Sequence, residues 1–228
     1  MKKRGNVNRF WIILAVVIVG LAGLFIVTKP KNSGDNKFNG DASKLQSDDH
    51  VRNQRDLKAT LIEYADFQCP ACGSYYPITK QLEAQYGDRV TFVYRHFPII
   101  SLHPNAFAAA RAAEAASNQG KFWEMHDKLF ETQDIWGRVA TNQQSLFEGY
   151  AKDLSLDLNK FKADYVTEVT ADRINRDVSS AKQFGITGTP TFILNGQKIE
   201  NPNGFEAFSK VLDKAIEEAT NNTPNKSN

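Results

Sequence analysis

The placement of the cysteines restricts the fold of this chain more than any other feature. The 228 residues contain only two cysteines, Cys69 and Cys72, within one Cys-Pro-Ala-Cys sequence. A segment rich in strand-forming residues, 60–66, precedes the pair, and a helical segment that runs to about Tyr86 follows it. The sequence therefore predicts a redox site at a strand–helix junction. No further cysteine remains to form a disulfide that would stabilise the fold.

The start of a helix is a favourable place for a reactive sulfur. Its first backbone N–H groups are unpaired and carry partial positive charge, which stabilises an anion. Pro70 suits this position, because the N–H that proline lacks is not needed in the first turn. We therefore expect a lowered pKa at Cys69, the exposed attacking sulfur, with Cys72 as the buried resolving sulfur and with Pro70 and Ala71 tuning the site.

Other uses of a cysteine pair fit this sequence less well. A structural zinc site needs about four ligands, but the chain has no second cysteine pair and its four histidines lack ligand-like spacing. A copper carrier is disfavoured because the chain has only two methionines. A purely structural disulfide would close too short a loop to stabilise the fold much. We expect no metal and no cofactor.

Two more residues qualify as parts of the site. Pro190 follows Gly188 and Thr189 directly before a strand, where a cis peptide bond would fit, although an ordinary turn is the alternative. Glu63 lies in an apolar strand six residues before Cys69. It is either a buried acid with a raised pKa, able to exchange a proton with Cys72, or a solvated strand residue.

The order of elements predicts an α/β domain. The first two strands, joined by a helix, are expected to pair in parallel with a right-handed crossover. A block of helices follows, then a hairpin with an Asn-Gly turn and a final helix. In sequence order the expected elements are strand 60–66, a helix to 86, strand 90–96, helical segments from 104 to 184, strands 191–194 and 197–200, and helix 205–218.

An apolar segment near the N-terminus predicts a membrane anchor. Phe10 to Val27 contains no charged residue, and as a helix it would be about 27 Å long, close to the thickness of a bilayer core. Lys2, Lys3, Arg4 and Arg9 precede it, which predicts a cytoplasmic N-terminus and a single pass. A cleaved signal peptide is the alternative, although the end of the segment resembles a cleavage site poorly. Either way the domain is exported.

Composition sets the remaining boundaries. The polar segment after the anchor favours a flexible stalk, and the net charge of +2 gives no reason to expect nucleic-acid binding. The expected organisation is a cytoplasmic tail (1–9), a transmembrane anchor (10–28), a stalk (29–55), a folded domain (56–218) and a disordered tail (219–228).

Several ordered blocks resemble the DsbA-like branch of the thioredoxin superfamily. They are Glu63–Cys72, Tyr94–Pro98, His103–Ala106, Gln119–His126 and Phe184–Phe192. The resemblance implies a thioredoxin-like core, βαβ then ββα, with helices inserted between the halves. It also implies a cis-proline at Pro190, a Thr189 backbone free to pair with an extended substrate, and a buried acid at Glu63.

The same resemblance implies disulfide exchange with exported proteins and, often, re-oxidation by a quinone-linked membrane partner. The sequence departs from the strongest oxidants of the family, which carry a histidine between the cysteines where this chain has Pro-Ala. That difference predicts a weaker oxidant. We expect a thiol oxidase; a reductase or isomerase with the same site and a non-catalytic, tethered peptide-binding or chaperone module are the alternatives.

Overall fold

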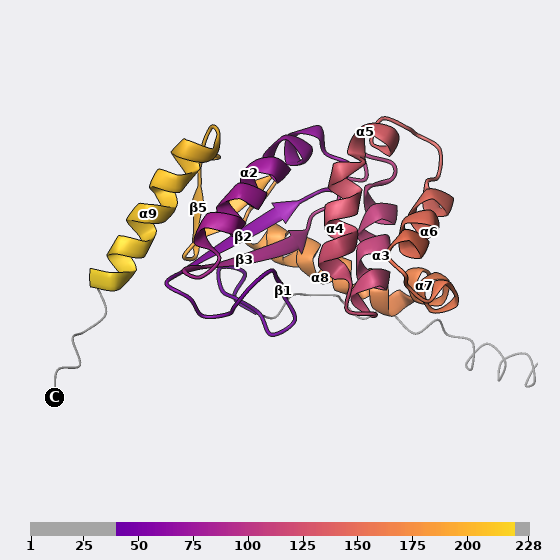
Figure 1. Cartoon of the computed structure of the whole chain (residues 1–228), viewed down its shortest axis with the longest axis horizontal. Coiled ribbons are helices and arrows are strands. Elements are labelled where there is room, and N and C mark those ends of the chain that lie inside the picture. The colour runs from indigo at the N-terminus through magenta and orange to yellow at the C-terminus, as the bar shows by residue number, and fades with distance from the viewer. Residues whose placement is uncertain (1–39, 222–228) are drawn as a thin grey trace, which may run out of the picture. The chain divides into compact units, whose positions relative to one another are not determined.

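The computed structural model describes residues 40–221 (Figure 1). The expected cytoplasmic tail, the anchor, residues 29–39 of the expected stalk and residues 222–228 of the expected disordered tail lie outside these residues. Within the described part, no helix is long and apolar enough to cross a bilayer.

The core is a five-stranded mixed sheet whose central strand leads to the cysteines. The strands are β1 (His50–Val51), β2 (Ala59–Ala65), β3 (Val90–His96), β4 (Thr191–Leu194) and β5 (Gln197–Ile199), in the order β1-β3-β2-β4-β5. The expected parallel pairing of β2 with β3 is confirmed, and the other neighbours are antiparallel. Because β2 lies in the middle, the residues at its end are held from both sides.

Helices cover both faces of the sheet and form the expected inserted block. They are α2 (Pro70–Tyr86), α3 (Ala106–Ser117), α4 (Phe122–Glu131), α5 (Gln133–Trp136), α6 (Gln144–Asp153), α7 (Leu158–Tyr165), α8 (Glu168–Gln183) and α9 (Phe205–Asn221). α2 and α9 pack with Leu61 and Phe192 on one face, whereas α8 packs with Ile62 and Tyr64 on the other. With both faces covered, every residue of β3 is buried.

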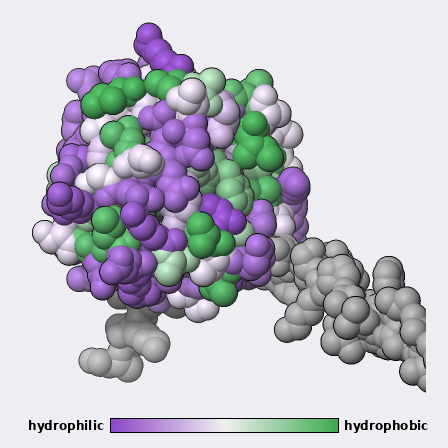
Figure 2. Space-filling view, turned by 90° about the vertical axis from the view of Figure 1, so that its right-hand side faces the viewer, coloured by the Kyte–Doolittle hydropathy of each residue, from purple (hydrophilic) through white to green (hydrophobic). Residues whose placement is uncertain are grey.

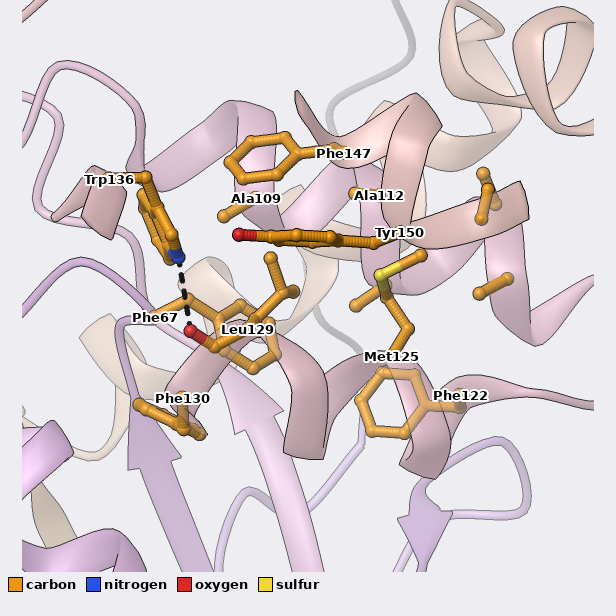
Figure 3. Packing of buried hydrophobic residues seen from close by; sticks show 14 of the residues in the cluster. Phe67, Ala109, Ala112, Phe122, Met125, Leu129, Phe130, Trp136, Phe147 and Tyr150 are labelled. Carbon is orange, nitrogen blue, oxygen red and sulfur yellow. Dashed lines mark hydrogen bonds between the residues drawn. The ribbon is translucent and has the colours of Figure 1, made fainter. Parts of the chain in front are cut away.

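The inserted helices α3 to α7 share one apolar core with Tyr94 of β3 and with Phe67 and the cysteines (Figure 3). Trp136 is fully buried in it, and its indole N–H donates a hydrogen bond of 3.1 Å to the carbonyl of Leu129. The short helix α5 is thereby fixed to α4. Seen from the side of α6 and α7, the outer surface is mostly polar, with apolar side chains in small groups (Figure 2).

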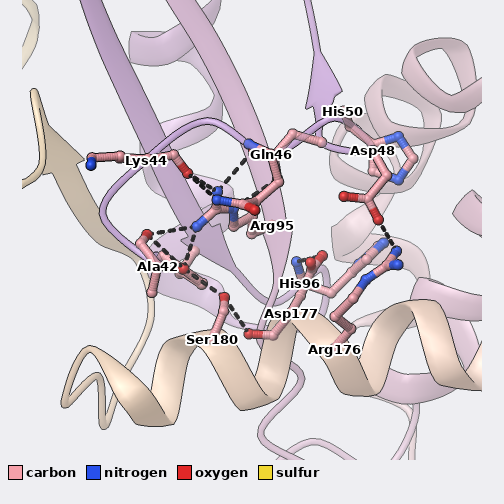
Figure 4. A network of polar contacts seen from close by, with 12 residues as sticks. Ala42, Lys44, Gln46, Asp48, His50, Arg95, His96, Arg176, Asp177 and Ser180 are labelled. Carbon is pink, nitrogen blue, oxygen red and sulfur yellow. Dashed lines mark hydrogen bonds and ion pairs between the residues drawn. The ribbon is translucent and has the colours of Figure 1, made fainter. Parts of the chain in front are cut away.

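The folded domain begins earlier than the sequence predicted. Arg95 on β3 is 1% exposed, and its guanidinium contacts both carboxylate oxygens of Asp49 at 2.8 Å and the carbonyl of Ala42 at 2.7 Å (Figure 4). A buried cation needs such partners, so it binds the polar segment 40–55 to the sheet. The expected stalk is therefore wrong for residues 40–55, which also supply β1. At the other end, α9 continues to Asn221, past the expected limit of 218.

Candidate active site

The cysteine pair lies at the junction between β2, which ends at Ala65, and α2, which begins at Pro70. Cys69 is the N-cap residue of α2, with extended backbone angles (φ −71°, ψ 122°), and Pro70 is the first helical residue. The Cys69 N–H donates to the carbonyl of Asp66 at 3.0 Å, and the Cys69 carbonyl accepts from the N–H of Gly73 at 3.1 Å. The strand–helix junction predicted from the sequence therefore holds the first cysteine at the N-terminal end of α2, where the helix dipole is positive.

The two sulfurs occupy different surroundings, and both are free thiols. Cys72 is fully buried and Cys69 is 7% exposed, so Cys69 is the more accessible sulfur but is less exposed than expected. A hydrogen bond from the Cys72 thiol, with further bonds from the backbone N–H groups of Cys72 and Ala71, lowers the pKa of Cys69 to about 5. Burial raises the pKa of Cys72, and the neighbouring Cys69 raises it further.

The Thr189–Pro190 peptide bond is cis, as the sequence analysis expected. The carbonyl of Thr189 lies 3.5 Å from the Cys69 sulfur, so the turn before β4 faces the cysteines. Asn201 holds this turn by donating to the carbonyl of Pro190 at 2.8 Å. The fold thus brings together residues about 120 positions apart in the chain.

Glu63 lies on β2, paired in register with Tyr94 and Phe192. Burial raises the pKa of this carboxyl to about 8, and the charge of Glu83 adds to the rise. Both glutamates line a cavity of about 20 Å³, which has room for about one water molecule. Glu63 is half-buried, which lies between the buried acid and the solvated residue that the sequence left open, but its raised pKa is the one expected of a buried acid.

Glu83 on α2 was not singled out by the sequence analysis. Burial raises its pKa to about 7 against the opposing effect of Arg52, with which it forms a 3.0 Å ion pair. Because Glu83 lies on a helix of mixed composition and meets Glu63 only across the cavity, its position in the chain gives no signal of this proximity.

Asp66, the residue that directly follows β2, is a further candidate for the site. It is 1% exposed. Its carboxylate accepts hydrogen bonds from the N–H of Gln68 at 2.8 Å, the N–H of Ile99 at 2.9 Å and Nδ1 of His103 at 2.6 Å. Its own N–H points at the Cys72 sulfur at 3.5 Å. Asp66 therefore ties the loop before the cysteines to the segment after β3.

One cluster has the side chains of a metal site but the geometry of hydrogen bonds. Nε2 of His50 and Nε2 of His96 lie 2.6 and 2.8 Å from the same oxygen of Glu114. Two ligands on one tetrahedral zinc ion, each about 2 Å from it, would lie about 3.3 Å apart. A zinc-binding histidine also donates its second ring nitrogen to an acceptor, and Nδ1 of His96 has no partner within residues 40–221. The cluster fits a hydrogen-bonded brace between β1, β3 and α3.

Comparison of the sequence with known proteins finds relatives that are much longer. The chain is 42% identical over 171 residues to a Na⁺/H⁺ antiporter, NhaA 3, of Salinispora tropica, which covers 75% of this chain and 25% of that protein. An antiporter NhaA of Herminiimonas arsenicoxydans is 37% identical over 165 residues, which is 72% of this chain and 25% of that protein. The chain thus spans about a quarter of the length of these relatives.

Comparison with solved structures finds the same fold in DsbA-type proteins. The α-DsbA1 protein of Wolbachia pipientis superposes with a TM-score of 0.68 at 21% identity, covering 77% of this chain and 94% of that one. BdbD of Bacillus subtilis in its oxidised form gives a TM-score of 0.63 at 22% identity, covering 73% and 92%. The family model described as thioredoxin matches residues 46–214, most of the described chain. The chain therefore belongs to the thioredoxin family, and its fold is that of the DsbA-type thiol–disulfide oxidoreductases.

Proposed function

We propose that this protein is an extracytoplasmic thiol–disulfide oxidoreductase that introduces disulfides into exported proteins through Cys69 and Cys72. The observation that carries the proposal is the difference between the two sulfurs: the pKa of Cys69 is lowered to about 5, whereas that of Cys72 is raised. A thiolate stabilised in the reduced protein favours reduction of the enzyme, and hence oxidation of its substrate.

The reaction begins with the disulfide between Cys69 and Cys72. A substrate thiolate attacks the Cys69 sulfur, the bond to Cys72 breaks, and a mixed disulfide forms at Cys69. A second substrate thiolate then attacks the substrate sulfur of the mixed disulfide and releases Cys69 as a thiolate. The substrate loses two electrons, and the cysteine pair gains them.

Glu63, Thr189 and Pro190 complete the proposed site. Glu63, which is neutral below its raised pKa of about 8, supplies a proton to Cys72 as that sulfur leaves and takes it back on re-oxidation. The turn at Thr189 and Pro190 binds an extended stretch of substrate beside Cys69, because it already faces that sulfur. Pro70 and Ala71 occupy the first turn between the cysteines and tune the Cys69 thiolate.

The proposed location rests on the sequence before residue 40. The apolar segment 10–28 anchors the chain in the cell membrane, with residues 1–9 in the cytoplasm and the catalytic domain outside. A membrane partner linked to quinones re-oxidises the cysteine pair. Ion transport is not part of the proposal, since the chain matches only about a quarter of the antiporter relatives.

A trapping experiment tests the proposal. Cys72→Ala removes the resolving sulfur, so mixed disulfides between Cys69 and exported proteins should accumulate in cells and disappear on reduction. Cys69→Ala is the matched control and should form none. If Cys72→Ala accumulates no such species, the oxidoreductase proposal is wrong.

Two further measurements separate the alternatives. A strongly reducing potential for the cysteine pair would make the protein a reductase or isomerase instead of an oxidase. Full activity in Cys69→Ser would indicate a tethered peptide-binding or chaperone module. An oxidising potential with inactive Cys69→Ser is the result that supports the proposal.

A further inference from the structure

Two glutamine side chains link the loop that carries Cys69 to the short helix α5 by reciprocal hydrogen bonds. The amide nitrogen of Gln133, the first residue of α5, donates to the carbonyls of Phe67 at 2.7 Å and Cys69 at 2.9 Å. In return, the amide nitrogen of Gln68 donates to the carbonyl of Gly137, the C-cap residue of α5, at 3.0 Å. We call Gln68 and Gln133 the glutamine clasp.

Both hydrogens of the Gln133 amide are used on the loop, and this fixes the backbone on both sides of the reactive residue. The peptide group after Phe67 is held by Gln133, and so is the peptide group after Cys69. The peptide group between Gln68 and Cys69 is held by the bond from the Cys69 N–H to Asp66. The direction of the Cα–Cβ bond of Cys69 follows from these three planes.

Gly73 makes room for the clasp. A Cβ atom at this position would overlap Oε1 of Gln133, the other atom of the amide. Gly73 lies inside α2, where glycine is less favourable than alanine. The space it leaves is therefore occupied by the Gln133 amide, and any larger residue would push that amide off the loop.

The other end of the clasp is rigid. Trp136, three residues after Gln133, is fully buried and bonded to α4 through its indole N–H. The amide of Gln133 therefore reaches the loop from a helix that is itself fixed in the core of the inserted block (Figure 3).

We propose that Gln133 is a positioning residue: it holds Cys69 in the orientation in which the sulfur faces Cys72 on one side and Thr189 on the other. The inference rests on the proposed function, in which Cys69 is the attacking sulfur. Without Gln133, the carbonyl of Phe67 loses its partner, and the peptide after Cys69 keeps only the bond from the Gly73 N–H and loses its second restraint. The sulfur then spends less time against the thiol and N–H groups that stabilise its thiolate.

Gln133→Met tests the proposal, because methionine has a similar length but cannot donate these bonds. The pKa of Cys69, followed by thiolate absorbance in the full chain, should rise by about one unit in this variant. The equilibrium constant with glutathione should then shift about tenfold toward the disulfide form of the enzyme. Gln144→Met is the matched control, because the Gln144 amide bonds only to Glu148 on α6 among the described residues, and it should change neither value.

A cycle of substitutions at Gly73 separates positioning from loss of stability. Gly73→Ala should raise the pKa of Cys69 as Gln133→Met does, although alanine suits a helix better than glycine. In a Gln133→Ala background the added methyl group has no amide to displace, so Gly73→Ala should cause no further rise.

The outcomes distinguish this inference from the proposed function. If the wild-type Cys69 has the pKa of an ordinary thiol, the proposed function fails. If the wild-type pKa is low but Gln133→Met and Gly73→Ala leave it and the glutathione equilibrium unchanged, the positioning role of Gln133 is overturned and the function stands. If these variants lower the melting temperature but leave the pKa of Cys69 unchanged, the positioning role of Gln133 is likewise overturned.

Discussion

The stability of the reduced protein is expected to depend on pH through Glu63, and Glu63→Gln isolates that dependence. Burial raises the pKa of this carboxyl from 4.5 to about 8. Between these values the folded protein holds a proton that the unfolded chain has released. The folded state thus binds more protons than the unfolded state, so stability falls as the pH rises through this window.

The size of the effect follows from the two pKa values. The difference, 8 − 4.5, is about 3.5 pH units, and each unit corresponds to 1.36 kcal/mol. The raised pKa therefore costs the folded state on the order of 4–5 kcal/mol above pH 8, about 2 kcal/mol at pH 6, and almost nothing below pH 4. Glutamine resembles the neutral acid at every pH, so Glu63→Gln should remove this cost.

Urea denaturation with the cysteines kept reduced, at several pH values from 4 to 9, measures the effect. The variant should match the wild type at pH 4 and exceed it by an amount that grows up to about pH 8 and then stays constant. Glu206→Gln, at an exposed position on α9, is the control and should show no such divergence. A constant difference between Glu63→Gln and wild type across this range would refute the raised pKa of Glu63.

Three further predictions test other parts of the structure. Asp49→Asn should lower the free energy of unfolding by about 3–5 kcal/mol in urea denaturation, because it leaves the buried Arg95 guanidinium without its anion. Alkylation of Cys69 by iodoacetamide should reach half its maximal rate near pH 5, the lowered pKa of that thiol. Trp136→Ala should cost about 3–5 kcal/mol in the same denaturation assay, because it empties a fully buried site.

Features of the fold that depend only on neighbouring residues could be predicted from local patterns in the sequence. The helix to Tyr86 and strand 90–96 have the expected ends, because the proline after Cys69 starts one and the Gly87-Asp88 turn separates them. The Asn195-Gly196 turn was also predictable: both residues have positive φ (48° and 83°), which a two-residue hairpin requires and which asparagine and glycine tolerate.

Features that depend on distant partners could not be predicted in this way. The segment 40–55 is polar, and composition alone favours a flexible stalk. Its order depends on Arg95, a charged residue in a strand that is buried on both faces, and nothing in the local pattern pairs Arg95 with Asp49. Gln133 and Glu83 were missed for the same reason, because each reaches the site only through the packing of a helix against β2 or its loop.

Because the two sulfurs differ in acidity, the two steps of the proposed reaction differ in whether the leaving sulfur needs a proton. In the first step Cys72 is the leaving group, and its raised pKa makes a bare thiolate costly there. In the second step Cys69 leaves, and its thiolate is already stabilised at neutral pH. During oxidation of the substrate, a proton donor is therefore needed while the mixed disulfide forms. We propose that Glu63, on the strand that ends just before the cysteines, serves that step and not the release of product.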